Sequence, residues 1–220
     1  MTTYATTSVT CGACGGIFTQ QILTSTNRMG SPDLDTRPPA MERSTMQTWV
    51  ERCPSCGYCA HKVSKFEESD RETLNSANYR AQLADATCPT LASTFICLGM
   101  LAANSGREPD TGWAYLQAAW VLDDFKQDEL ARMWRSKAAD IFLAQLNAGK
   151  SFAGQPGGSE AVTVDCLRRA GRGAEAVPII QPALSKGYED VIQKILFYQQ
   201  KLIEQGDIAR HLIKDALEVK

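Results

Sequence analysis

Apolar residues recur at helical spacing through most of the chain, from about residue 67 to its end. In one such segment, Leu91, Phe95 and Leu98 are three or four positions apart, which places them on one face of a helix. Glycine or proline separates the periodic stretches, and Gly149 ends one of the longest. The pattern predicts helices over residues 67–86, 89–104, 110–123, 127–148, 159–170, 174–185, 188–205 and 207–219.

The first part of the chain has a different pattern. Residues 17–25 alternate loosely and carry β-branched side chains, which favours a strand, and residues 47–52 are the expected partner strand. Residues 30–39 contain a glycine and three prolines and form the predicted loop between them. The sequence therefore predicts a mainly α protein with two domains, a small β head over residues 1–66 and an all-α body over residues 67–220.

Composition and charge exclude several classes of protein. The chain has 220 residues, of which 44% are hydrophobic and 22% charged, as in ordinary globular proteins. No apolar run is long enough to cross a bilayer, which needs about 18 residues or more. The net charge of −2 gives no overall attraction to nucleic acid or anionic lipid. Residues 1–10 lack the basic cluster and apolar core of a secretory signal, so we expect a cytoplasmic location.

Two pairs of cysteines carry the strongest chemical signal. Cys11 and Cys14 form one CxxC motif, Cys53 and Cys56 form another, and a glycine follows each. Two intervening residues let both thiolates of a pair reach one ion, and the glycine permits a tight turn. Four thiolates complete a tetrahedron with no position for water, which predicts a structural zinc ion in a zinc ribbon-like head. Rubredoxin-like iron uses the same ligands, so the spacing leaves iron open.

Other uses of these cysteines are also open. Cys59 and His61 follow the second motif and could replace one of its ligands, although Cys59 would need a turn of its own. We expect Cys59 to pack beneath the ribbon and His61 to lie on the surface. A thioredoxin-like redox pair would require a βαβ pattern, and none surrounds either motif.

The loop between the cysteine pairs contains alternating polar residues. Asp33, Asp35 and Arg37 would point to one side of an extended chain. They could form a site for a ligand, a metal or the charged groups of a partner. Alternatively, the aspartates form local turns, Arg37 pairs with them, and the loop docks the head on the helices, which is the interpretation that common turn chemistry favours. The chain has only two histidines and no motif that links them to a nucleophile, so we predict no catalytic residue.

The helical part shows internal similarity. Residues 98–99 and 113–123 resemble the two helices of a tetratricopeptide repeat, and residues 167–184 resemble a weaker copy. Such repeats stack because one helical hairpin cannot bury its apolar face alone, and the resulting groove often binds peptides. Three arginines are expected on a solvated basic face: Arg168, Arg169 and Arg172. Three tryptophans at helical spacing are expected in the core: Trp113, Trp120 and Trp134.

The motifs together resemble a known family. Residues 11–15, 31–38 and 53–58, combined with the helical tail, are similar to an uncharacterised bacterial family that is catalogued as a domain of unknown function. The resemblance implies a zinc ribbon-like head on a tetratricopeptide-like body in the bacterial cytoplasm. It implies no activity.

Three hypotheses of function follow. The first is a non-enzymatic, zinc-stabilised adaptor or scaffold with a protein or peptide partner in the helical groove. It predicts that chelation unfolds residues 1–60 while the helices survive. The second is a nucleic-acid-binding ribbon, which the near-zero charge disfavours. The third is a metal-dependent hydrolase in which Asp33 and Asp35 hold a divalent cation.

Overall fold

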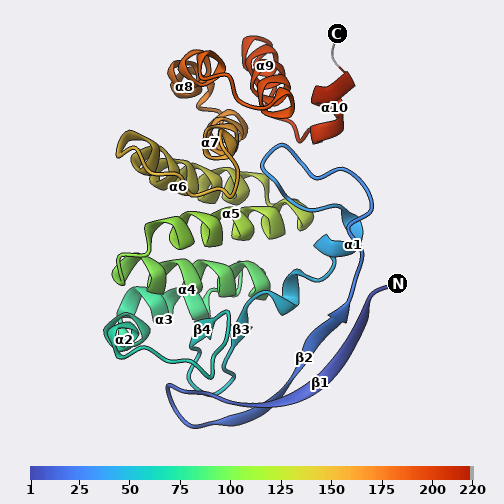
Figure 1. Ribbon diagram of the computed structural model, residues 1–220. Coiled ribbons are helices and arrows are strands. Elements are labelled where there is room, and N and C mark those ends of the chain that lie inside the picture. The colour runs from blue at the N-terminus through green and yellow to red at the C-terminus, as the bar shows by residue number, and fades with distance from the viewer. Residues whose placement is uncertain (219–220) are drawn as a thin grey trace.

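Helices dominate the protein. The computed structural model describes residues 1–218, and it consists of a helical stack with two small two-stranded antiparallel sheets at one end (Figure 1). This confirms the predicted mainly α fold with a small strand head. Within the described range, none of the helices combines the length and apolar character needed to span a membrane.

The helical body is a layered stack in which each helix packs on the next (Figure 1). From α4 to α9, each helix begins and ends within two residues of a predicted one. The last helix, α10, begins at Ile213, six residues after the predicted start at residue 207. Its predicted end at residue 219 lies outside the described residues. The helices of the stack are α4 (Thr90–Asn104), α5 (Glu108–Asp124), α6 (Asp128–Asn147), α7 (Gly158–Arg169), α8 (Gly173–Ser185), α9 (Asp190–Glu204) and α10 (Ile213–Glu218).

Two glycines bring consecutive helices unusually close. A Cβ atom added at Gly99 of α4 would lie 2.4 Å from the ring of Tyr115 in α5. A Cβ atom at Gly112 of α5 would lie 2.4 Å from the ring of Phe142 in α6. Each aromatic ring therefore occupies the space that a side chain would take, which allows the helices to interlock.

The prediction of one continuous helix over residues 67–86 is wrong. The segment contains η2 (Glu68–Asp70), α2 (Arg71–Asn75) and α3 (Ala77–Ala84). Ser76 has an extended backbone and caps α3, since its side chain accepts a hydrogen bond of 3.3 Å from the Tyr79 N–H. The break reorients the chain, so that residues on both sides of it, Leu74 and Tyr79, are buried.

The strand pairing also differs from the prediction. β2 (Ile17–Ser25) pairs with β1 (Thr3–Thr10), not with residues 47–52. The chain between β1 and β2 turns back tightly at the first cysteine motif, which makes β1 the nearest available strand. Residues 46–48 form a 3-10 turn, η1 (Met46–Thr48), and the short β3 (Glu51–Arg52) pairs with β4 (Cys59–Ala60). A single turn of helix, α1 (Ala40–Arg43), precedes η1.

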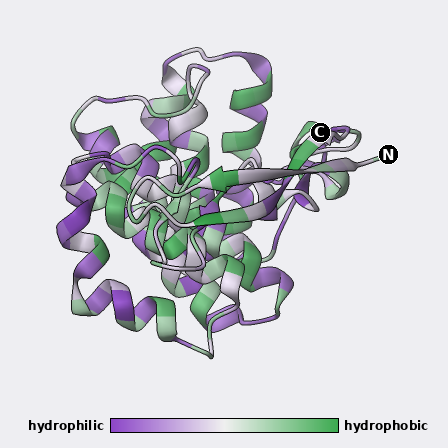
Figure 2. Ribbon diagram, turned by 90° about the horizontal axis from the view of Figure 1, so that it is seen from below, coloured by the Kyte–Doolittle hydropathy of each residue, from purple (hydrophilic) through white to green (hydrophobic). Residues whose placement is uncertain are grey.

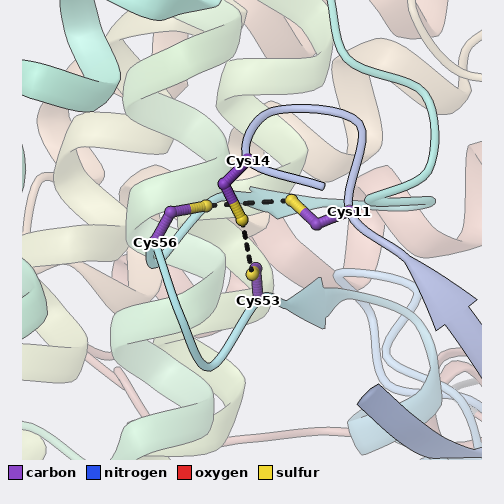
Figure 3. A group of neighbouring side chains, drawn as sticks. All are labelled: Cys11, Cys14, Cys53 and Cys56. Atoms are coloured by element: carbon purple, nitrogen blue, oxygen red, sulfur yellow. Dashed lines mark hydrogen bonds between the residues drawn. The ribbon is translucent and has the colours of Figure 1, made fainter. Parts of the chain in front are cut away.

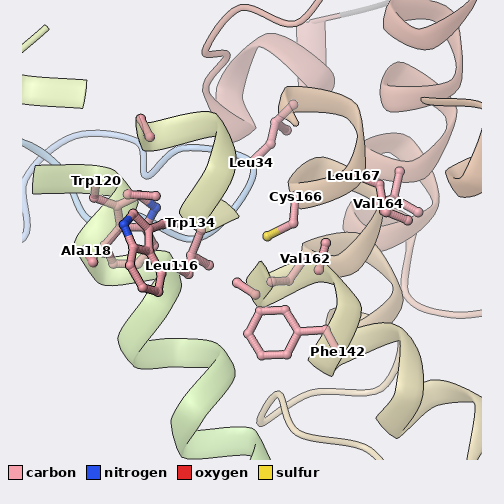
Figure 4. Close-up of a cluster of buried hydrophobic side chains, with 14 of the residues drawn as sticks. Leu34, Leu116, Ala118, Trp120, Trp134, Phe142, Val162, Val164, Cys166 and Leu167 are labelled. Atoms are coloured by element: carbon pink, nitrogen blue, oxygen red, sulfur yellow. The ribbon is translucent and has the colours of Figure 1, made fainter. Parts of the chain in front are cut away.

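Head and body share their hydrophobic cores. Leu34, Met46 and Val50 of the head belong to the core of the helical stack, and Figure 4 shows Leu34 near Cys166 and Leu167 of α7. A second core joins the cysteine motifs to residues of α2, α3 and α4. Within residues 1–218, β1 and β2 alone form an extended arm, which crosses the underside of the body and reaches the edge of the molecule at its N-terminal end (Figure 2).

Candidate functional site

The two cysteine motifs have the same backbone geometry. The N–H of Gly15 donates to the carbonyl oxygen of Cys11 at 2.8 Å, and the N–H of Gly57 donates to that of Cys53 at 2.9 Å. Both glycines have positive φ angles, 75° and 77°, in the left-handed region that favours glycine. Each motif is therefore a tight turn that brings its two sulfurs to the same side.

The four sulfurs meet in one cluster. The Sγ atoms of Cys11 and Cys56 are 3.7 Å apart, as are those of Cys14 and Cys53, and all four lie within 4.8 Å of one another (Figure 3). Metal–sulfur bonds of about 2.3 Å in a tetrahedron separate the sulfurs by about 3.8 Å, whereas a disulfide requires about 2.05 Å. The cluster therefore fits a metal ion bound by four thiolates. Such an ion would link the turn between β1 and β2 to the turn between β3 and β4.

Backbone amides around the cluster favour thiolates. Burial raises the pKa of Cys53, but hydrogen bonds from the N–H groups of Cys56 and Ser55 outweigh it and lower that pKa to about 7. Burial raises the pKa of Cys56 and of Cys11, against the opposing effect of backbone amides. A cation at the centre would stabilise the ionised form of every sulfur.

Side chains of helix α3 form hydrogen bonds with the backbone of the second cysteine motif. Arg80 donates to the carbonyl oxygen of Cys56 at 2.7 Å, and the Tyr79 hydroxyl donates to that of Gly57 at 2.9 Å. The Tyr79 oxygen also accepts a bond of 3.2 Å from the N–H of Cys59, which is fully buried. Neither Cys59 nor the exposed His61 is part of the sulfur cluster in the described range.

The structure also brings together Asp33, Asp35 and Arg37, each at most 1% exposed. They do not alternate along an extended chain, because the backbone turns at Thr36, whose φ of 69° is in the left-handed region. The N–H of Thr36 donates to the Asp33 carbonyl and the N–H of Asp33 donates to the Arg37 carbonyl, both at 2.9 Å. Thr36 is the exposed tip of this tight turn.

A network of charges around Asp35 joins the loop to three helices. The Asp35 carboxylate accepts a bond of 2.8 Å from the indole of Trp120 in α5 and one of 3.1 Å from Arg169 in α7. Arg169 and Arg135 of α6 both bind Asp123 of α5, at 2.9 Å and 2.7 Å. Burial would raise the pKa of Asp123, but the two guanidinium groups outweigh it and hold that pKa below its ordinary value.

The other loop charges are also paired. Arg37 forms an ion pair with Asp124, and burial lowers the pKa of Arg37. Asp33 accepts a bond of 3.2 Å from Arg43. Burial, reinforced by the neighbouring Asp35 charge, raises the pKa of Asp33 to about 6.

The segment before α10 closes over the loop. The N–H of Leu34 donates to the carbonyl oxygen of His211 at 3.0 Å, and the N–H of Ile213 donates to that of Pro32 at 2.9 Å. Asp33 and Leu212 form an isolated antiparallel bridge. The loop therefore lies between the helical stack and the C-terminal segment.

The prediction that Arg168, Arg169 and Arg172 lie on a solvated face is wrong for the first two. Arg168 is 1% exposed and pairs with Asp165 at 2.7 Å, and Arg169 is 7% exposed in the network around Asp35. The partner of Arg169 is distant in the sequence, so the local pattern did not indicate it. Only Arg172 forms the more exposed ion pairs expected of a surface residue.

Two cavities open on either side of Thr36. The first, of about 410 Å³, is lined by prolines of the loop and by residues of α5. The second, of about 490 Å³, is mainly apolar and lies against α7 and α9, with Phe152 and Ile195 in its wall. Thr36 and Trp113 line both cavities. Trp113 was predicted as a core residue, and its helical spacing gave no signal that part of its ring would stay accessible.

Comparisons of the chain with models of protein families, with curated proteins and with solved structures give no match. The similarity to a bacterial family, which rests on the short motifs, stays a prediction.

Proposed function

We propose that the protein is a non-enzymatic, zinc-stabilised adaptor or scaffold that binds a peptide segment of a partner protein in its helical groove, over Thr36 and Trp113. Zinc is the proposed ion because four thiolates in a closed tetrahedron are its usual structural ligands. Its role in this proposal is to hold together the two cysteine turns, which pack against α2, α3 and α4.

The pairing of the loop charges supports a binding role over a hydrolytic one. Asp35 already faces Arg169, and Arg135 lies 3.9 Å from the same carboxylate oxygen. A divalent cation at Asp35 would be repelled by these guanidinium groups. The polar residues of the loop are thus better suited to positioning it than to holding a catalytic metal.

The observation that carries the proposal is the position of Thr36. A β-branched residue in the left-handed region is strained, and such strain persists where the surroundings fix it. Here the ion pairs on both sides fix the turn, and they leave the Thr36 side chain exposed between two cavities. The apolar cavity beside Trp113 has the size and lining to accept one large apolar side chain of a peptide.

Site-specific photo-crosslinking in the source cells tests the proposal. A photo-reactive amino acid at Thr36 should give a covalent adduct with one protein at near-stoichiometric yield, and Trp113→Ala should reduce the yield about tenfold or more. The same amino acid at Glu129, an exposed position on α6, is the matched control. Equal labelling from both positions, or no adduct from Thr36, would overturn the proposal. Binding to nucleic acid that weakens steeply with salt would support the ribbon hypothesis instead.

A further inference from the structure

The outer edge of the β1–β2 arm is an unprotected strand edge. β1 has eight residues, and neither strand contains a charged side chain or a proline. The register with β2 shifts between Thr3 and Tyr4, at the end of the arm, and is regular from Tyr4 to Thr10. Natural proteins usually protect such an edge with lysine, proline, a bulge or a covering segment, because its free N–H and C=O groups can pair with another strand. The side chains of β1 are exposed or half-buried, and none is fully buried.

The two edges of the arm differ in their surroundings. Within residues 1–218, β2 is the one strand that pairs with β1, and no backbone hydrogen bond from another segment reaches β1. The opposite edge of the arm faces the body: every residue of β2 from Phe18 to Leu23 lines a cavity of about 1080 Å³, whose far wall includes residues 47–52. If β2 turned one face of the sheet to the cavity, only every second residue would line it. Because consecutive residues of β2 line it, the edge of β2 is directed towards the cavity. The outer edge of β1 is therefore the one directed to solvent (Figure 1).

We propose that this edge is a self-association surface, on which β1 of a second copy of the chain pairs antiparallel to form a four-stranded sheet. In an antiparallel two-fold contact, residues near the axis lie close to their own counterparts, so a charged residue there would repel itself. β1 satisfies this requirement along its whole length, because its polar residues are all neutral. Threonine and serine pairs across strands are also favourable.

The sequence of β1 is compatible with such symmetry. With Thr7 opposite its own counterpart, Ala5 faces Val9 and Thr6 faces Ser8 of the other copy. From Tyr4 to Thr10, the odd-numbered residues of β1 are half-buried and the even-numbered ones are exposed, so this register keeps the half-buried face of both copies on one side of the sheet. In this register seven residues of each strand, Tyr4–Thr10, face one another. A single strand contact of this length is small for an interface, and we therefore expect weak, concentration-dependent dimers.

Sedimentation equilibrium of the intact, zinc-loaded chain tests the proposal. From about 1 to about 500 μM, the mass should rise from 24.1 kDa towards twice that value. The double variant Thr6→Lys with Ser8→Lys places lysines opposite each other across the two-fold and should weaken association by about tenfold or more. Its matched control is Thr19→Lys with Gln21→Lys, since these are the exposed register partners of Ser8 and Thr6 on β2, one strand away from the contact. The control should associate as the wild type does.

A wild-type mass that stays at 24.1 kDa at all concentrations would overturn the inference. So would association that the β1 and β2 lysine variants weaken equally, or association that neither variant weakens. Circular dichroism and metal content verify that each variant is folded. The crosslink at Thr36 addresses a different surface, so this inference and the proposed function can fail independently.

Discussion

The indole N–H of Trp120 donates a hydrogen bond of 2.8 Å to the carboxylate of Asp35, a residue 85 positions away in the chain. Both side chains are buried, and the same carboxylate oxygen is 3.1 Å from Arg169. This contact joins the loop of the head to α5 and α7. A buried carboxylate that is shared in this way makes the position of the loop depend on the body and the packing of the body depend on the loop.

Removing the charge of Asp35 tests that dependence. Asp35→Asn keeps the size of the side chain but removes one of the two carboxylates that pair with the buried guanidinium of Arg169, the other being that of Asp123. We expect the free energy of unfolding to fall by about 3 to 5 kcal/mol, the usual effect of breaking a buried ion pair. Urea denaturation followed by circular dichroism measures it. A loss below about 1 kcal/mol would show that the network is dispensable.

The indole bond can be separated from packing by a pair of tryptophan variants. Trp120→Phe removes the donor to Asp35. Because a hydrogen bond to a charged group is lost, this variant should be less stable than Trp134→Phe by about 1.5 to 3 kcal/mol. Trp134→Phe makes the same change of size in the same core, where Trp134 packs against Tyr115. Equal destabilisation of the two variants would contradict the role given to the bond.

The raised pKa of Asp33 leads to a specific pH dependence. An acid whose pKa rises from 3.8 to about 6 on folding binds its proton more tightly in the folded protein. Its contribution to stability is therefore fully present below pH 3.8 and is lost as the pH rises towards about 6. One pKa unit corresponds to about 1.4 kcal/mol. We expect the stability of the wild type relative to Asp33→Asn, which cannot ionise, to fall by about 3 kcal/mol between about pH 3 and pH 7.

Denaturant melts of both proteins at several pH values provide the measurement. Because the other carboxylates are common to the two proteins, the difference reports the ionisation at position 33 together with its interaction with the neighbouring Asp35. A difference that stays constant or grows with pH would contradict the assignment.

Removal of the metal should loosen the protein in a defined region. The sulfur cluster ties the turns at Cys11 and Cys53, whereas the loop around Asp35 is held by helices that the metal does not contact. We expect chelation to speed amide exchange in the two turns, the arm and α3, while the loop and α5 to α7 keep their protection. This is narrower than the loss of residues 1–60 predicted from the sequence, because Leu34, Met46 and Val50 belong to the core of the helical stack. Hydrogen exchange with mass spectrometry resolves the two patterns.

A cysteine pair controls for unspecific effects of losing a thiol. Cys14→Ser removes an exposed member of the cluster, and we expect its metal content to fall well below the single equivalent that we expect for the wild type. Cys88→Ser changes a buried thiol outside the cluster and should keep the full equivalent. Elemental analysis measures the metal content of both proteins. Equal loss of metal from the two variants would contradict the assignment of Cys14 as a metal ligand.

What the sequence could predict depended on how local each signal is. Helices α4 to α9 were predicted within two residues because apolar periodicity and terminal glycines act over a few positions. The tight turns of the cysteine motifs were predictable for the same reason. The position of Asp35 was not, since its partners Trp120 and Arg169 are 85 and 134 residues away and no local pattern relates them.

The strand β1 was missed for a different physical reason. Its side chains are mostly threonine, serine and alanine, so the contrast between its two faces is weak. Neither face is fully buried, and the hydrophobic alternation that marks a half-buried strand is therefore faint. Its pairing with β2 follows from the turn at the first cysteine motif, because the metal-binding pattern indicates a turn there but not that the turn joins two strands.

The close contact between α5 and α6 gives a final test of the helical packing. In an ordinary exposed helix, replacing glycine by alanine stabilises by up to about 1 kcal/mol. At Gly112 the new methyl group would lie 2.4 Å from the ring of Phe142, which is fully buried and cannot move away freely. We therefore expect Gly112→Ala to destabilise the protein by about 1 to 3 kcal/mol, as overpacked cores do.

Gly154→Ala is the control because no atom lies within 4 Å of its added Cβ. If thermal unfolding shows Gly112→Ala to be as stable as the wild type, the two helices are not packed as tightly as described. The double variant Gly112→Ala with Phe142→Leu should recover part of the loss, since the smaller side chain leaves room for the methyl group.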